Sequence, residues 1–177
     1  MGRVPLSVKM AIVTTAFKPA RRFLGGFPRP GPFYVPQIRK SVLLPYSAER
    51  MFDLVAKVSD YPKFMPWCGG AREAQTEDGR VRASVDIDYH GVKSGFTTIN
   101  RNDRPRSIAM EFAEGPFSSL EGLWTFTALS PEACKVEFGL SYEFAGGILG
   151  KLVAPVFDFI ANSFIDAFAK RAEALYG

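Results

Sequence analysis

The chain has 177 residues, a length that fits one domain with a substantial core. Its two cysteines and single histidine, Cys68, Cys134 and His90, exclude a disulfide framework and the common zinc sites. The net charge of +4 is uneven: residues 1–40 carry eight basic residues and no acid, whereas the remainder carries 14 basic and 18 acidic residues. The folding part is therefore mildly acidic and has no general attraction to phosphate backbones.

Residues 1–36 are expected to form a basic, proline-rich extension, followed by a single domain over residues 37–177. Six of the 13 prolines fall within residues 1–40, and the sequence Phe27–Pro32 disfavours regular structure. Three interpretations stay open: a disordered arm that contacts anionic lipid or RNA, a transit-like segment, or a non-native start, with translation beginning at Met10 or later.

The domain is expected to begin with a strand and two short helices. Residues 39–44 favour a strand that ends at Pro45. Ser47 is a good N-cap for a helix that runs to about residue 57. Residues 59–64 favour a second helical turn, and residues 65–70 then lead into a sheet.

Strand signals follow one another over residues 70–144. Turn-forming residues separate segments at 70–75, 79–89, 92–101, 108–112, 120–126 and 134–144. The last segment alternates apolar and polar residues most clearly. Short turns between consecutive strands predict an antiparallel meander.

From Gly147 the apolar residues recur every three or four positions, which predicts a long C-terminal helix. We expect a kink or a fresh helix start at Pro155. Lys151, Asp158 and Asp166 interrupt the stretch and argue against a membrane span.

This order of elements, together with several segments, resembles the coenzyme Q-binding protein family and its bacterial branch of RatA-type toxins. The resemblance covers residues 37–177 and depends on the order of the segments more than on any one of them. The segments are Val42–Glu49, Val58–Cys68, Glu114–Phe117, Leu123–Phe126, Cys134–Phe138, Asp166–Phe168, Arg171–Ala172 and Leu175–Gly177. It implies an α+β helix-grip fold of the START/SRPBCC type, with a curved antiparallel sheet of about seven strands wrapped around the C-terminal helix.

The resemblance implies non-catalytic binding and transfer of ubiquinone, or of a similar polyisoprenoid lipid, in support of respiratory electron transport. Ubiquinone would be a bound ligand, and no catalytic residue, metal or further cofactor is implied. A bacterial cytoplasmic protein with transient contact to the inner membrane is favoured over a mitochondrial one. The oligomeric state stays open.

The alternative is a RatA-type toxin that binds the large ribosomal subunit and blocks subunit association. In that case the basic extension and the cluster of Arg101, Arg104 and Arg106 would contact ribosomal RNA. A small cyclase- or hydrolase-like enzyme is a third hypothesis, weakened by the lack of a convergent acid–base set.

A quinone requires an apolar tunnel with a polar end. Tyr89 and Thr98 are expected to donate hydroxyl groups to the quinone carbonyls. Cys68 is expected to be a small buried group, and Asp86 with Asp88 a solvated face. The predicted cavity lining consists of Pro66, Trp67, Tyr89, Phe96, Thr98, Met110, Phe112, Trp124, Phe126, Phe138, Val156, Phe157, Ile160 and Phe164.

Overall fold

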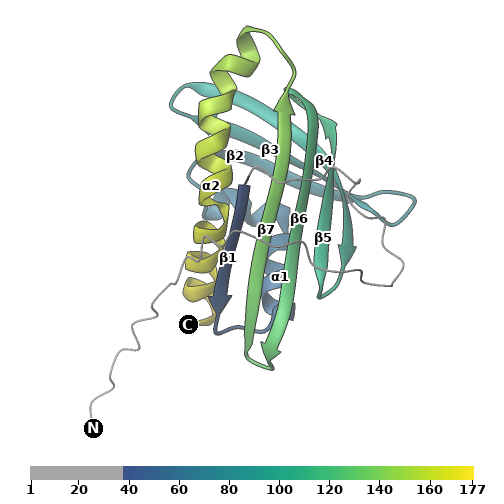
Figure 1. Cartoon of the computed structure of the whole chain (residues 1–177), viewed down its shortest axis with the longest axis vertical. Coiled ribbons are helices and arrows are strands. Elements are labelled where there is room, and N and C mark those ends of the chain that lie inside the picture. The colour runs from purple at the N-terminus through teal and green to yellow at the C-terminus, as the bar shows by residue number, and fades with distance from the viewer. Residues whose placement is uncertain (1–37) are drawn as a thin grey trace.

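The strands and helices follow the predicted order. The computed structural model describes residues 38–177 (Figure 1), so the expected extension over residues 1–36 lies outside the described part. The elements are β1 (Ile38–Leu44), α1 (Ala48–Ala56), the 3₁₀ helix η1 (Val58–Lys63), β2 (Cys68–Gln75), β3 (Val81–Tyr89), β4 (Val92–Asp103), β5 (Ser107–Glu114), β6 (Phe117–Ser130), β7 (Ala133–Phe144) and α2 (Ile148–Tyr176).

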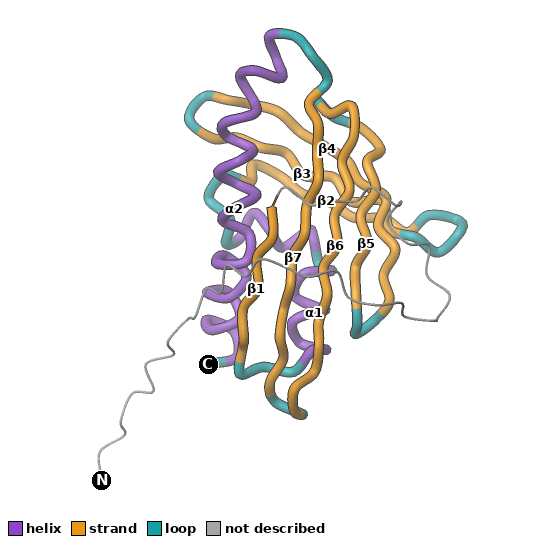
Figure 2. The backbone as a smooth tube through the Cα atoms, in the orientation of Figure 1, coloured by secondary structure: helices purple, strands orange, loops and turns teal. Residues whose placement is uncertain are grey.

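Within residues 38–177, seven strands form one antiparallel sheet in the order β1-β7-β6-β5-β4-β3-β2. Each strand from β2 to β7 pairs with its neighbour in sequence, as short turns require. The first strand pairs with the last, so that Ile38 faces Leu140 and Leu44 faces Cys134. The sheet curves around α1 and α2 (Figure 2), which confirms the helix-grip expectation.

The first helix begins where the sequence predicts. The Ser47 hydroxyl group accepts a hydrogen bond from the Arg50 backbone amide at 3.3 Å, which satisfies one of the free amides of the first turn. The apolar side of α1 is buried, including Met51, Phe52 and Val55. This side packs against β6, β7 and α2.

The C-terminal helix is continuous from Ile148 to Tyr176, with Pro155 inside it. This continuity excludes a fresh helix start at Pro155, which was one of the two expected alternatives, and the other alternative, a kink, stays a prediction. One side of α2, which includes Phe157, Phe164 and Phe168, is buried in the grip of the sheet. Residues 151–176 are long and apolar enough to cross a membrane by composition, but here 44% of that apolar window is buried inside the fold.

Candidate functional site

A small cavity lies between the sheet and α2, where the predicted ligand site was expected. Its volume is about 40 Å³. That is room for about one or two waters, whereas small-molecule sites usually enclose about 300–1,000 Å³. The cavity is lined by Val58, Tyr61, Ala83, Val85, Phe96, Thr98, Asn100, Met110, Leu120, Trp124, Phe138, Leu140, Phe157 and Phe164.

Half of the predicted lining residues line this cavity. Those are Phe96, Thr98, Met110, Trp124, Phe138, Phe157 and Phe164. The other predicted residues lie outside the lining: Pro66, Trp67, Tyr89, Phe112, Phe126, Val156 and Ile160.

The predicted residues outside the lining differ in position. Pro66 is exposed, while Trp67 is buried behind the lining with its ring 5.4 Å from that of Phe164. Phe126 packs on Phe52 of α1, at 5.5 Å between ring centroids. Tyr89 stacks on Phe159 at the outer side of α2. The alternation of apolar and polar residues identifies the inward side of each strand. It carries no information on how close each inward residue lies to the cavity.

Two aromatic groups pack around the cavity. In the first, Phe164 approaches Phe138 edge-on at 5.6 Å, and Phe138 stacks on Trp124 at 4.3 Å. In the second, the Phe157 ring lies 4.7 Å from Phe117 and 5.7 Å from Phe96. Edge-to-face contacts of this kind stabilise aromatic pairs beyond their buried area. The rings that would line a ligand site therefore fill most of it.

The polar groups of the cavity come mainly from one strand. Thr98 and Asn100 are both buried, and the Thr98 hydroxyl group donates to the Asn100 side-chain carbonyl at 2.7 Å. The sequence analysis missed Asn100, although it lies two residues beyond Thr98 and must share its side of β4. The Asn100 amide group is left as the donor that could meet a carbonyl oxygen of a ligand.

Among the described residues that line the cavity, Tyr61 alone is titratable. Burial, with a smaller effect of Glu73, raises the pKa of Tyr61 above its usual range. Its hydroxyl group donates to the Val55 carbonyl at 2.7 Å and fixes η1 on α1. The Tyr61 hydroxyl group therefore stays protonated at neutral pH, and its hydrogen is already engaged in a hydrogen bond. The lining thus suits binding better than acid–base chemistry.

The cysteines lie in apolar surroundings. Burial raises the pKa of the Cys68 thiol and raises that of Cys134 to about 11. Both stay protonated at neutral pH, as expected of small buried groups. Asp86 and Asp88 are exposed and form ion pairs with Arg72 and Lys93 at 3.5 Å and 3.4 Å. No group of metal ligands occurs among residues 38–177.

The arginine cluster proposed for RNA contact is largely neutralised. Arg104 donates two hydrogen bonds to Asp53 of α1, at 2.7 Å and 2.8 Å. Arg106 binds Asp103 in the same way, at 2.8 Å and 2.7 Å. These arginines fix the β4–β5 turn, so they offer less charge to a partner than the sequence suggests.

Comparison with known proteins gives a consistent assignment. Residues 44–169 match the family described as polyketide cyclase/dehydrase and lipid transport. The chain is 41% identical over 142 residues to the ribosome association toxin RatA of Escherichia coli, covering 80% of this chain and 90% of that protein. It is 29% identical to the mitochondrial coenzyme Q-binding protein COQ10 homolog B of Xenopus laevis, covering 78% of this chain and 58% of that protein.

The fold is also found in solved structures. A START superfamily protein from Mycobacterium smegmatis superimposes with a TM-score of 0.64 at 22% identity, covering 78% of this chain and 97% of that chain. The order of the strands, the single long C-terminal helix and these sequence matches agree. The chain therefore belongs to the polyketide cyclase/dehydrase and lipid transport family, within the group formed by the RatA toxins and the coenzyme Q-binding proteins.

Proposed function

We propose that this chain associates with the ribosome, as its RatA relatives do by name. The observation that carries this proposal is the match of 41% identity that extends over 90% of RatA. The match to the coenzyme Q-binding protein is weaker and covers 58% of that protein. The ribosome therefore replaces the quinone as the first candidate partner, and the chain would act in the cytoplasm without catalysing a reaction.

The charges suggest which part of the chain would contact RNA. Residues 38–177 carry 16 basic and 18 acidic residues, whereas residues 1–37 carry six basic residues and no acid. The Arg104 and Arg106 guanidinium groups already bind carboxylates. The basic residues before β1 are thus the main candidates for phosphate contacts, with Arg101 as an exposed addition on β4.

Sedimentation through a sucrose gradient tests this proposal with the full chain and separated bacterial ribosomal subunits. We expect co-sedimentation with the large subunit at low salt, weakening as salt rises, and a smaller yield of whole ribosomes when the subunits are mixed. Replacing Arg21, Arg22 and Arg29 by Gln should weaken binding. Replacing Lys93, Lys135 and Lys151 by Gln is the matched control. Absence of the wild-type chain from every ribosomal fraction at low salt would exclude the proposal.

Binding of an apolar molecule is a second candidate, favoured by the cavity. Its lining is aromatic and aliphatic apart from Thr98, Asn100 and the Tyr61 hydroxyl group. That pattern fits a quinone, which has an apolar tail and carbonyl oxygens in its head group. At about 40 Å³ the cavity must expand to admit one, so binding would require the rings of α2 to move away from the sheet.

Gly122 on β6 allows this candidate to be tested without adding a charge. A methyl group at Gly122 would collide with the tip of Met110, which lines the cavity. Because that tip is flexible, Gly122→Ala should fold while forcing the tip to shift within the lining and lowering ligand uptake. The control is Gly146→Ala, where an added methyl group meets nothing within 4 Å.

Mass spectrometry of solvent extracts, from protein purified out of a quinone-producing host, gives the readout. A stoichiometric quinone in the wild type and in Gly146→Ala, reduced in Gly122→Ala, supports the candidate. An empty wild-type protein whose melting temperature is unchanged by added quinone excludes it.

A further inference from the structure

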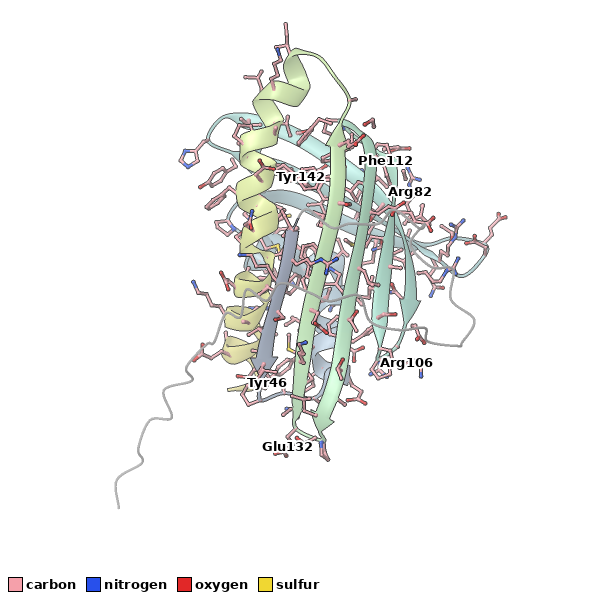
Figure 3. All side chains as sticks on the ribbon, viewed as in Figure 1. Tyr46, Arg82, Arg106, Phe112, Glu132 and Tyr142 are labelled. Atoms are coloured by element: carbon pink, nitrogen blue, oxygen red, sulfur yellow. The ribbon has the colours of Figure 1, made fainter. Side chains whose placement is uncertain are left out.

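A second, larger pocket lies at the end of the molecule where β1, α2 and the β6–β7 turn meet. Its volume is about 440 Å³, and it is lined by Pro45, Tyr46, Ser47, Arg50, Pro131, Glu132 and Tyr176. Figure 3 shows Tyr46 and Glu132 at this end, whereas Tyr142 and Phe112 lie towards the opposite end. The two linings share no residue, so this pocket is separate from the cavity between the sheet and α2.

The walls of this pocket carry two charges of opposite sign. The Arg50 guanidinium group lies 5.4 Å from the centre of the Tyr176 ring, and Tyr46 meets that ring edge-on at 5.6 Å. Within residues 38–177, neither Arg50 nor Glu132 forms an ion pair, although both line the pocket. Each charge is therefore available to an opposite charge on another molecule.

The pocket lies beside a protruding turn. Pro131 and Glu132 form the turn between β6 and β7, and Figure 1 shows this turn projecting farther than the ends of β1 and α2. The same two residues form one wall of the pocket. A projection next to a hollow is self-complementary, because a two-fold axis between them places the projection of each copy in the hollow of the other.

Exposed apolar side chains gather at the same end. Leu43, Leu129 and Leu175 are 60%, 57% and 48% exposed, and they lie next to the ends of β1, β6 and α2. Leu43 and Leu129 each precede a proline of the pocket, Pro45 and Pro131, by two residues. Tyrosine and arginine side chains with apolar neighbours are typical of protein–protein interfaces, so this end suits a protein partner.

We propose that the chain forms a two-fold dimer through this end of the molecule. The β6–β7 turn of each copy would enter the pocket of the other, with Pro131 against the tyrosine rings. Arg50 would bind the partner's Glu132, and Glu132 would bind the partner's Arg50, because a two-fold contact repeats each pair. This dimer goes beyond ribosome association and does not depend on it.

The charges of the pocket disfavour a phosphate group as its occupant. A phosphate bound by Arg50 would lie in the same pocket as the Glu132 carboxylate, which repels it. The neighbouring carboxylates of α1, Glu49 and Asp53, both interact with Arg104 and leave Arg50 unpaired. A second copy resolves the conflict, because it supplies a cation for Glu132 and an anion for Arg50.

The dimer would leave the rest of the chain accessible. β1 begins at Ile38, and the pocket lies beyond its other end, after Leu44. The basic residues before β1 therefore precede the end of β1 that lies opposite the interface. One dimer would offer two such basic segments to RNA.

Charge exchange tests the proposal in the full chain. Arg50→Glu and Glu132→Arg each place like charges in both contacts, so each variant should dimerise at least about tenfold more weakly than the wild type. An equimolar mixture of the two variants restores opposite charges in both contacts and should dimerise again. Both variants should fold, because a glutamate three residues after the Ser47 cap suits the first turn of α1 and the Glu132 side chain is exposed.

Sedimentation equilibrium over a range of concentrations measures the association, and circular dichroism with melting temperature checks the fold. The control variants are Arg101→Glu and Glu121→Arg, which change exposed residues of β4 and β6 outside the pocket and should dimerise as the wild type does. Single variants that dimerise like the wild type, or a mixture that stays as weakly associated as each variant alone, would overturn the proposal. A wild type that stays monomeric at every concentration would overturn it as well, and would leave ribosome association untouched.

Discussion

The Tyr142 hydroxyl group on β7 donates a hydrogen bond to the Asp158 carboxylate on α2, and its ring lies 4.8 Å from that of the neighbouring Phe157. Figure 3 shows Tyr142 between the strand and the helix. Burial, and next the hydrogen bond to Asp158, raise the pKa of Tyr142 above its usual range, so the phenol stays a donor at neutral pH. This bond and the Phe157 ring hold the first turns of α2 against the sheet.

Tyr142→Phe should loosen that end of α2. The variant keeps the ring and removes the hydroxyl group, so the free energy of unfolding should fall by about 1 kcal/mol. Hydrogen exchange in the first turns of α2 should accelerate more than exchange in its last turns. Tyr176→Phe removes a hydroxyl group at the other end of α2 and serves as the control, with no acceleration expected in the first turns. Equal exchange rates in Tyr142→Phe and the wild type would mean that the aromatic contacts alone hold α2.

Phe157 and Phe159 offer a comparison of identical substitutions two residues apart. Phe157 is 1% exposed and contacts Phe117, Tyr142 and Phe96, whereas Phe159 is 54% exposed. Phe157→Ala should lower the free energy of unfolding by about 3–5 kcal/mol, because it leaves a large cavity. Phe159→Ala should lower it by less than about 1 kcal/mol. Urea denaturation measures both, and similar losses would contradict the arrangement of α2.

Thr98→Val should separate stability from ligand recognition at the polar end of the cavity. The substitution keeps the shape but leaves the buried Asn100 carbonyl without its donor, at a cost of about 1–3 kcal/mol in unfolding free energy. If the cavity takes a quinone, affinity for the quinone should fall while affinity for a hydrocarbon of similar length stays the same. An equal loss for both molecules would show that the polar pair does not contact the head group. Isothermal titration measures these affinities.

Alkaline pH should destabilise the fold partly through Cys134. Burial raises the pKa of this thiol from an ordinary value of 9.0 to about 11. The unfolded chain therefore releases the proton first as pH rises, and the native state is penalised. The contribution is fully present below pH 9 and is lost as pH rises towards 11. Urea midpoints across this range should fall less steeply in Cys134→Ala, and parallel curves for both proteins would contradict the prediction.

Several features of the fold could be predicted from local patterns. Ser47 followed by an apolar run gave the start of α1, and the alternation over Cys134–Phe144 gave β7 and its inward side. Both depend on neighbours within a few residues. At Pro155 only the expected fresh helix start is excluded. The proline removes one hydrogen bond two turns into α2 without ending the helix, because the buried residues Val153 and Phe157 on both sides of it are held by tertiary packing.

The site was less predictable than the fold. Period-two alternation placed Phe96, Thr98 and Met110 on the inward side, and all three line the cavity. It also selected Phe112 and Phe126, which pack elsewhere in the core. Inward direction is a local property, whereas depth depends on the curvature of the sheet and on the rings that other elements contribute.

The sequence by itself determined the order of the elements, the apolar side of each strand and the apolar character of the last helix, because backbone geometry and side-chain spacing act locally. Only the tertiary structure decided three further points. It joined β1 to β7, bound Arg104 to Asp53, and filled the expected tunnel with aromatic rings until about 40 Å³ remained. Each of these brings together groups that lie far apart along the chain, and their meeting depends on how the whole sheet curves around α2.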